Sequence, residues 1–267
     1  PVLVTVYNRY GHFVQCMQSL ASCRGAEKTD VFIASDAASR EEDIERVLQI
    51  REYAKGLKAF QSLTILAPDE NIGAIQNYRR AEQYVFERYD TLIFTEDDNI
   101  FAPDFLEFVN QGLSVYENRK DIYAVCGYNY PIEMPVEYKH DTYIWIGFSA
   151  WGVGIWKDRW ESTIEEPPLE ELKSFLKDRS YMKKLDAIAG HYRPALQNII
   201  DTGHYTGDTI YSYQMFMHGH HCVFPSVTRV RNIGHDGSGV HCVVDDSQEF
   251  LQQEISCGDK PIVFNEA

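Results

Sequence analysis

The chain has 267 residues, of which 44% are hydrophobic, and a formal net charge of −15. A chain of this size can bury a sizeable core as one large domain. Its acidity argues against nucleic acid or an anionic membrane as a partner, because both bind to basic surfaces. An anionic substrate is still compatible with it, since a metal ion held by carboxylates can bridge to phosphates.

The sequence shows no apolar run long enough to span a bilayer and no signal peptide. It starts at Pro1 directly in a strand-like run, which suggests a piece of a longer protein. The six cysteines form no CxxC pair, so we expect reduced thiols in a cytoplasmic protein, with a peripheral place at the inner membrane face left open. A disulfide between Cys242 and either Cys222 or Cys257 is also left open.

Strand-like and helix-like segments alternate along the first half of the chain. Strands are expected at Val2–Tyr7, Val31–Ser35, Leu63–Ala67, Thr91–Thr95 and Tyr123–Gly127. Helices are expected at residues 11–22, 40–55, 73–88 and 103–118. Such alternation is typical of βαβ units, so we predict an α/β fold with a mostly parallel, doubly wound sheet.

The character of the sequence changes near residue 128. Aromatic side chains crowd residues 128–160, and residues 168–201 look helical and charged. The expected elements that follow are a helix at Asp208–His218, a strand at Cys222–Phe224, a glycine-rich segment at Asn232–His241 and a polar tail. Because no repeat or linker interrupts the chain, we expect a single domain over residues 1–267, with regions at 1–127 and 128–245 and a tail at 246–267.

The most informative segment is the expected fourth strand, which ends at three consecutive acids, Glu96, Asp97 and Asp98. Adjacent negative charges repel one another and are tolerated best where a divalent cation or its ligand compensates them. The carboxyl ends of strands in an open α/β sheet are also where ligands bind. We therefore predict a metal and nucleotide site here; the alternative is a solvated acidic turn that caps the next helix.

Polar residues also follow the first three strands. Asp36 ends the second strand, where an acid can accept hydrogen bonds from a base or ribose or can cap the next helix. Tyr7 and Arg9 follow the first strand, and Arg9 suits a phosphate, a base or simple neutralisation of the acidic face. Asn71 and Gly73 precede the third helix, where glycine allows close approach of a ligand, but the pattern is a weak phosphate-loop signal.

The second region holds further candidates. Asp208 stands behind a glycine at a helix start, either as a helix cap or as a general base. His235 and His241 lie among glycines that would let an imidazole reach a metal already held by carboxylates, although a loop histidine is usually a surface residue. Trp151 and Gly152 offer the floor of a sugar subsite, although aromatics in this stretch are more often core or rim.

Together these residues resemble a glycosyltransferase of the GT-A, Rossmann-like fold, with a mixed, aromatic-rich acceptor side. Trp151–Trp160 and the segment NIGHDGSGVHC, which starts at Asn232, are similar to bacterial family 2-type sugar transferases. Glu96–Phe105 is similar to the inverting Golgi alpha-mannoside beta-1,2-N-acetylglucosaminyltransferase. The likeness covers about residues 1–245 but is poor over 161–206, so it does not identify the acceptor.

The resemblance implies a role for each matching residue. Asp98 would hold Mn²⁺ or Mg²⁺ on the diphosphate of a nucleotide-sugar, most commonly a UDP-sugar, and His241 would touch the metal or the diphosphate. Asp97 would lie against the ribose or the donor sugar, and Asp208 would be the catalytic base. The remaining nucleotide-sugar contacts are assigned to Tyr7, Arg9, Asp36, Asn71, Gly73, Glu96, Trp151 and Gly152.

The implied reaction is single displacement with inversion, from a nucleotide-sugar bound by residues 1–127 to a hydroxyl of a glycan or glycolipid, as in polysaccharide biosynthesis. One alternative is a sugar-nucleotide nucleotidyltransferase, but Val2–Tyr10 lacks the glycine-rich, basic loop that would bind a triphosphate. Another is a non-catalytic carbohydrate-binding or degenerate transferase domain of a larger protein. The acids, the loop histidine and Asp208 argue against degeneration.

Overall fold

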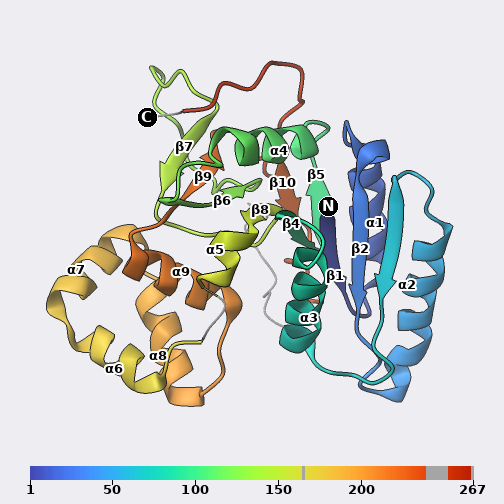
Figure 1. Cartoon of the computed structure of the whole chain (residues 1–267), viewed down its shortest axis with the longest axis horizontal. Helices are drawn as coiled ribbons and strands as arrows, with labels where there is room; N and C mark the ends of the chain where they lie inside the picture. The colour runs from blue at the N-terminus through green and yellow to red at the C-terminus, as the bar shows by residue number, and fades with distance from the viewer. Residues whose placement is uncertain (164–165, 239–251, 266–267) are drawn as a thin grey trace.

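The computed structural model describes residues 1–163, 166–238 and 252–265 of the chain. An eight-stranded sheet in the order β3-β2-β1-β4-β8-β6-β9-β7 forms its centre (Figure 1). Its strands are β1 (Val2–Val6), β2 (Asp30–Ser35), β3 (Ser62–Leu66), β4 (Thr91–Glu96), β6 (Ile122–Cys126), β7 (Thr142–Trp145), β8 (Val153–Trp156) and β9 (His221–Pro225). A second sheet pairs β5 (Asn99–Phe101) with β10 (Val230–Asn232).

The central sheet is mostly parallel, as predicted. Strand β8 pairs antiparallel with both β4 and β6, and β7 pairs antiparallel with β9. The other neighbouring strands of this sheet run parallel to each other. The two antiparallel strands both belong to the aromatic-rich region after residue 128, so the mixed character of the sheet is confined to that region.

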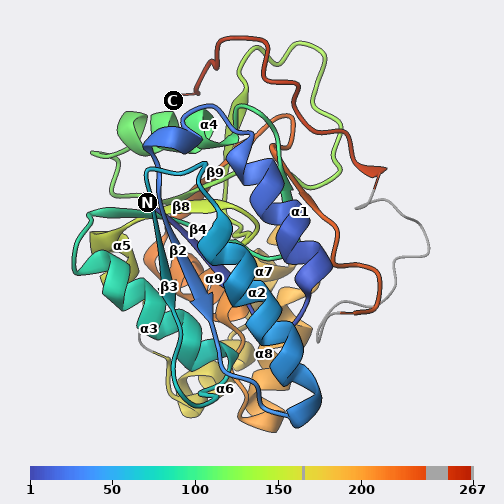
Figure 2. The same ribbon diagram turned by 90° about the vertical axis from the view of Figure 1, so that its right-hand side faces the viewer.

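Helices cover both faces of the sheet, which confirms the doubly wound arrangement. They are α1 (Tyr10–Ala21), α2 (Ile44–Gly56), α3 (Ala74–Phe86), α4 (Phe105–Val115), α5 (Lys157–Glu161), α6 (Leu169–Lys177), α7 (Arg179–Ile188), α8 (Tyr192–Thr202) and α9 (Gly207–His218), with 3₁₀ turns at Ala26–Lys28 and Glu41–Asp43. Helices α1, α2 and α4 share one hydrophobic core, and α3, α5 and α9 share the other. Figure 2 shows α1 and α2 side by side across the first face.

The alternation of side chains along β1 explains why a layer of helices packs on each face of the sheet. Val2 and Val4 belong to the core beneath α1 and α2, whereas Leu3 belongs to the core beneath α3. Successive residues of a strand point to opposite faces, so an all-apolar strand is stable only between two layers. Strand β1 therefore lies in the middle of the molecule, and the residues that follow it are held rigidly.

The region between β8 and β9 forms a small helical unit of its own. Leu172, Met182 and Leu196 represent a third hydrophobic cluster, built by α6, α7 and α8 and joined by residues of α9. Figure 1 shows these helices beside the sheet rather than stacked on its centre. The predicted helical character of residues 168–201 is confirmed, and the chain divides it into three short helices.

Two further expectations concern the helices and the cysteines. Among the helices within the described residues, none is both long enough and apolar enough to cross a membrane. The five cysteines in the described part of the chain are free, and four of them are buried: Cys16, Cys23, Cys126 and Cys222. The remaining one of these five is Cys257, which is exposed, whereas Cys242 lies outside the described residues.

Candidate functional site

The candidate residues of the first region gather because four parallel strands end at one edge of the sheet. Thr5 of β1 pairs with Glu96 of β4, and Val6 of β1 pairs with Ser35 of β2. The segments after β1, β2, β3 and β4 therefore emerge at the same edge. Strand β8 runs in the opposite direction, so its start, just after Gly152, lies at this edge as well.

The acidic turn is the centre of this edge. Asp97 and Asp98 lie between β4 and β5 and are only 4% and 3% exposed. The Arg9 guanidinium bridges them: Nη2 contacts Asp97 Oδ1 and lies 2.8 Å from Asp98 Oδ2. Arg9 is the residue immediately before α1, so the end of β1 delivers a positive charge to the end of β4.

Strand β10, which comes near the carboxyl end of the sequence, forms hydrogen bonds with this turn. Asn232 donates its side-chain amide to Asp98 Oδ1 at 2.9 Å, and the backbone N–H of Ile233 donates to the Asp98 carbonyl oxygen at 2.8 Å. Gly234 passes so close that a Cβ there would overlap Asp98 Oδ2. The Asp98 side chain is thus held by Arg9 before α1, by Asn232 of β10 and by the backbone of Gly234 after β10.

The electrostatics of the turn follow from its burial. Burial raises the pKa of Asp97 to about 6, while the neighbouring Arg9 opposes that rise. The proximity of Asp98 adds a smaller upward shift, and His12 a smaller downward one. The two carboxylates are therefore costly to keep charged together without a cation between them.

Asp36 forms hydrogen bonds with the loop between β3 and α3. Its carboxylate accepts hydrogen bonds from the backbone N–H groups of Ala37, Ile72 and Gly73 at 2.8, 3.1 and 2.9 Å, and from the Asn71 amide at 3.1 Å. This ties the end of β2 to the loop before α3. Gly73 adopts φ +83°, a conformation that suits glycine. The structure thus brings together Asp36, Asn71 and Gly73.

Tyr7 fixes the segment that follows β2. Its hydroxyl donates to Asp43 Oδ2 at 3.0 Å and accepts from the backbone N–H of Ser39 at 2.8 Å. Asn8 donates to the other oxygen of the Asp43 carboxylate at 2.7 Å. Asp43 is 1% exposed, so this cluster pins residues 39–43 against the end of β1. The Tyr7 side chain is thereby placed at the same edge as Arg9, one loop away from the acidic turn.

Trp151 lies two residues before the start of β8. Its indole meets His235 edge-on, with ring centroids 5.6 Å apart, and packs in the same manner on Tyr128 at 4.6 Å. Gly152 has φ +68°, and a Cβ there would lie 2.8 Å from both Phe105 and Val230. Glycine is therefore required at this position, and the close packing holds the indole beside the glycine-rich loop.

The other candidates are placed as follows. Glu96 is the last residue of β4, directly before the acidic turn, and is half-buried. Asp208 is the second residue of α9, which begins one residue earlier than predicted. His241 lies outside the described residues. His235, the other histidine candidate, belongs to the described part of the glycine-rich loop.

One pair at this edge was missed from the sequence. His12 of α1 places its Nε2 3.1 Å from Asp236 Oδ2, and this contact joins the first helix to the glycine-rich loop. Its position in the sequence could have revealed His12, because it lies in the first turn of the helix that follows β1. That turn is next to the carboxyl ends of the parallel strands. Asn232 was part of the quoted motif, but only the pairing of β10 with β5 reveals its contact with Asp98.

The donor chemistry of the turn fits a hard divalent cation. Carboxylate oxygens are the ligands that Mg²⁺ and Mn²⁺ prefer, and a site with one or two carboxylates is completed by water and substrate phosphates. Over residues 1–163, 166–238 and 252–265, no group of three or more His, Cys, Asp or Glu side chains could hold a metal without such help. The Gly234 backbone lies directly against the Asp98 carboxylate, and the residue has no side chain to intervene.

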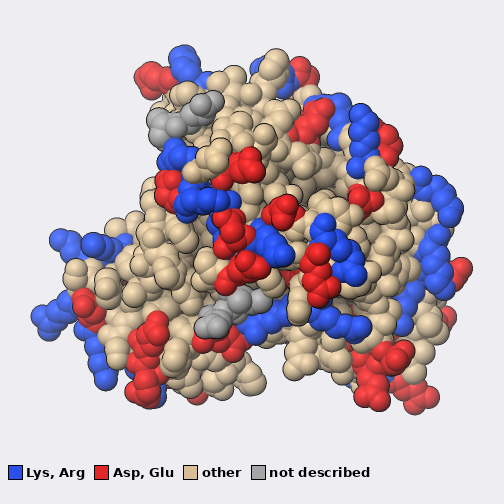
Figure 3. Space-filling model, in the orientation of Figure 1, with Lys and Arg blue, Asp and Glu red and all other residues tan. Residues whose placement is uncertain are grey.

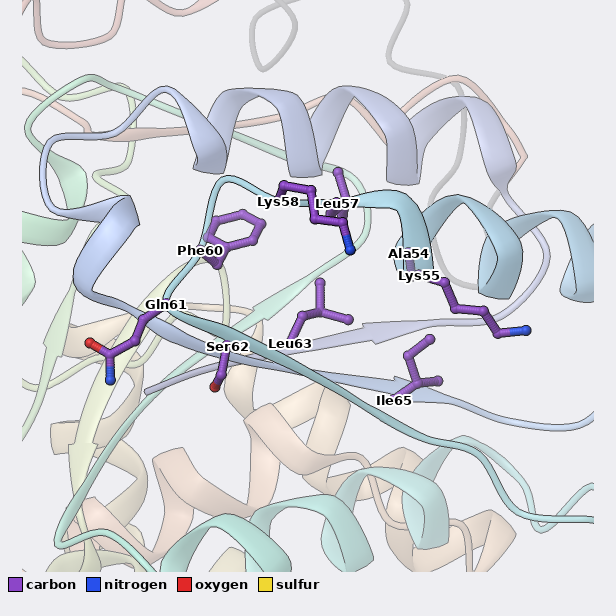
Figure 4. Close-up of a pocket in the computed structure, with 9 residues that line it drawn as sticks. All are labelled: Ala54, Lys55, Leu57, Lys58, Phe60, Gln61, Ser62, Leu63 and Ile65. Carbon is purple, nitrogen blue, oxygen red and sulfur yellow. The ribbon is translucent and has the colours of Figure 1, made fainter.

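A groove elsewhere on the molecule is separate from this site. It has a volume of about 510 Å³ and lies between the end of α2 and the start of β3, with Lys55, Lys58, Phe60 and Leu63 in its lining (Figure 4). Because it borders the amino end of β3, it is at the opposite edge of the sheet from the acidic turn. On the face shown in Figure 3, acidic and basic side chains are interspersed.

The chain was compared with known proteins and structures. No family model matches it, and no curated protein matches it by sequence. GalNAc-T7 with UDP, GalNAc and Mn²⁺ matches with a TM-score of 0.52 at 12% identity, over 86% of this chain and 43% of that chain. Mannosyltransferase PcManGT from Pyrobaculum calidifontis, in complex with GDP-Man and Mn²⁺, matches with a TM-score of 0.43 at 13% identity, over 82% and 68%. TarS of S. aureus matches with a TM-score of 0.43 at 13% identity, over 66% and 33%.

The structural neighbours are thus glycosyltransferases, and the likeness to GalNAc-T7 confirms the predicted GT-A fold. This chain spans 33% of the TarS chain and 43% of the GalNAc-T7 chain. At these identities the comparison establishes the fold alone.

Proposed function

We propose that this chain is a metal-dependent glycosyltransferase of the family 2 type that moves a sugar from a UDP-sugar to a hydroxyl of a glycan or glycolipid, with inversion. The observation that carries the proposal is the buried pair Asp97 and Asp98 at the carboxyl end of β4, facing Arg9, within a GT-A fold. GalNAc-T7, which shares the fold, binds UDP, GalNAc and Mn²⁺ in its crystal structure, and this supports the same kinds of ligand here.

The residues around the turn supply what a diphosphate needs. Asp98 would hold the divalent cation, which balances the charge that develops on the leaving diphosphate, with His241 as a second contact. Arg9 can pair with a phosphate through the same planar fork that now contacts the carboxylates. Asp97 would lie against the ribose or the donor sugar, and the edge formed by Tyr7 and Asp36 would border the nucleoside.

The second half of the site would activate the acceptor. Asp208, at the start of α9, would take the proton from the attacking hydroxyl as that oxygen forms its bond to the anomeric carbon. The bond between the anomeric carbon and the diphosphate oxygen breaks in the same step, and a single displacement inverts the anomeric configuration. Trp151 would form the floor of the sugar subsite, and the close packing at Gly152 would keep its indole in place. NMR of the product's anomeric proton tests this, and retention would contradict the role of Asp208.

A calorimetric titration tests the donor site most directly. We expect UDP to bind in the presence of Mn²⁺ and much more weakly after EDTA treatment, because the cation bridges the diphosphate to Asp98. A panel of nucleotide-sugars, assayed for metal-dependent hydrolysis, then identifies the donor. A protein that binds no nucleotide with or without Mn²⁺ but does bind glycans would instead be a carbohydrate-binding module.

The substitution Asp208→Asn tests the assignment of the base. Removing a positioned general base typically lowers the rate about 10²–10⁴-fold, while donor binding should remain because Asp208 is not among the residues assigned to the donor. Transfer rate and UDP affinity are measured for both proteins. Asp201→Asn, at an exposed position of α8, is the matched control. Transfer by Asp208→Asn at the parental rate would show that another group is the base.

A further inference from the structure

The acidic turn contains a cation of its own, the Arg9 guanidinium. Arg9 contacts both Asp97 and Asp98, and its partners' side chains are only 6% and 5% exposed. One guanidinium that comes from the end of β1 therefore contacts both carboxylates and balances one of their two negative charges. Arg9 and His12 are the basic side chains whose charge acts on Asp97, and His12 is itself engaged by Asp236.

The remaining oxygen of Asp98 is also engaged. Asn232 donates to Oδ1 at 2.9 Å, while Arg9 lies 2.8 Å from Oδ2. A divalent cation needs a lone pair of Asp98 and cannot share Oδ2 with a guanidinium N–H directed at the same atom, because both carry positive charge. Metal and Arg9 are therefore alternatives at Oδ2.

Arg9 differs from its partners in being more exposed to solvent. Its side chain is 19% exposed, against 6% and 5% for the two carboxylates, so it lies at the rim of the site. Guanidinium matches phosphate as well as carboxylate with two parallel hydrogen bonds. In the acidic turn a single nitrogen, Nη2, contacts both carboxylates, so a diphosphate bound at this edge offers Arg9 a two-pronged alternative, and the contact with Asp98 Oδ2 is lost when Arg9 takes it.

We propose that Arg9 is an exchangeable counter-ion: it occupies the acidic turn in the free protein and moves to the diphosphate of the donor, so that the divalent cation enters only with the nucleotide. This rests on the proposed function for the identity of the donor. The consequence is a positive coupling between UDP and Mn²⁺. Such coupling is reciprocal and typically amounts to about 5- to 150-fold in affinity.

The substitution Arg9→Met removes the internal cation and retains much of the side-chain volume. We expect Mn²⁺ without nucleotide to bind this variant about 5- to 150-fold more tightly than the wild type, as measured by calorimetry and by the electron paramagnetic resonance of free Mn²⁺. Mn²⁺ should also raise the thermal midpoint of Arg9→Met more than that of the wild type, because a ligand stabilises the form that it binds. UDP should raise the Mn²⁺ affinity of the variant less than that of the wild type, because only the direct bridge of the cation to the diphosphate remains in the variant.

Two further proteins make the test specific. Arg24→Met removes one positive charge from an exposed pair with Glu107 and should leave Mn²⁺ affinity unchanged, which excludes a general effect of net charge. Asp98→Asn added to Arg9→Met should abolish the gain, which places the ion at the acidic turn. If Arg9→Met fails to fold, Arg9→Gln serves in its place, since it also removes the charge.

The outcomes separate the two proposals. If Arg9→Met and the wild type bind Mn²⁺ equally well while the wild type still binds UDP and Mn²⁺ together, the counter-ion proposal is overturned. The proposed glycosyltransferase function is then unaffected. If Arg9→Met binds Mn²⁺ more tightly but the wild type binds no UDP, the role of Arg9 as counter-ion is supported and the proposed UDP-sugar donor is overturned. A gain that survives Asp98→Asn overturns the placement of the ion and the proposal with it.

Discussion

Gly234 shows how a single backbone position protects the acidic turn. Its N–H donates to the side-chain oxygen of Asn232 at 2.8 Å, and Asn232 in turn donates to Asp98. A Cβ at position 234 would overlap Asp98 Oδ2 and lie 3.1 Å from Arg9 Nη1. The lack of a side chain therefore lets the late loop lie directly over the carboxylate.

The substitution Gly234→Ala should disturb both the site and the fold. We expect UDP and Mn²⁺ to bind at least about tenfold more weakly, because the new methyl group displaces the Asp98 side chain, with a loss of about 1–3 kcal/mol in unfolding free energy. Calorimetry and thermal unfolding measure the two effects. Gly11→Ala is the control, because a Cβ there meets nothing within 4 Å. Unchanged ligand binding by Gly234→Ala would contradict this account.

The residues of the first region could be placed from the sequence because parallel strands have one common end. Asp36, Asp97 and Arg9 each follow a recognisable strand, so their convergence on one edge required no knowledge of side-chain packing. Their individual contacts could not be foreseen, since they depend on partners far along the chain: Asn232 lies more than a hundred residues beyond Asp98. The contact of Asp36 with Ile72 and Gly73 depends in the same way on the conformation of a loop.

At the scale of the elements, a buried acid joins α3 to α5. Glu82 of α3 is fully buried and accepts a hydrogen bond from the Trp160 indole N–H at 3.0 Å. Burial raises the pKa of Glu82 to about 8, although hydrogen bonds from Tyr78 and Trp160 favour its charged form. The Tyr78 hydroxyl also lies 3.4 Å from that of Tyr211, so the neighbourhood of Glu82 reaches α9.

The substitution Glu82→Gln should therefore change how stability depends on pH. Folding favours the protonated acid, so its contribution is complete below pH 4.5, the ordinary value, and is lost as the pH rises through about 8. Over that interval the stability of the wild type should fall relative to Glu82→Gln by up to about 1.4 kcal/mol per pH unit. Chemical denaturation at several pH values measures the difference.

The control for this experiment is Glu87→Gln, at the exposed end of the same helix. Its difference from the wild type should not vary with pH in the way that the difference for Glu82→Gln does. A stability difference between Glu82→Gln and wild type that stays constant from acid to neutral pH would show that Glu82 is already charged in the folded protein.

The elements that the sequence did not reveal share one physical property. Strands β5 and β10 have three residues each, and β7 and β8 have four, so none is long enough to show a periodic pattern. Strand β8 also contains Gly154, a residue that is depleted in strands, and it is buried along its length. Its place between β4 and β6 is decided by tertiary pairing, whereas the long helices and the parallel strands carry their own signals.

At the scale of the whole molecule, residues 252–265 form a strap that closes the far edge of the sheet. Figure 1 shows it running over α4 towards β7. Val263 donates its backbone N–H to Asp141 at 2.7 Å, and Asn265 donates to Thr142 at 2.8 Å. Between them, the Phe264 ring stacks on Phe108 of α4, with ring centroids 5.6 Å apart.

The substitution Phe264→Ala should loosen the strap without touching the donor site. We expect a loss of about 1–3 kcal/mol in unfolding free energy, because a partly buried aromatic ring is removed from α4, and unchanged affinity for UDP and Mn²⁺. Val263→Ala is the neighbouring control, since that side chain is 50% exposed and its backbone contact is retained. A large fall in UDP affinity for Phe264→Ala would mean that the strap and the acidic turn are coupled.

The third hydrophobic cluster has a consequence for protein engineering. Leu172, Leu185 and Leu196 pack with one another and meet the main body chiefly through α9, so the segment has its own internal support. It also falls within residues 161–206, where the family likeness is poor. Exchanging these helices as one block should therefore leave the packing around Asp97 and Asp98 undisturbed, which makes the block a natural unit for chimeric proteins.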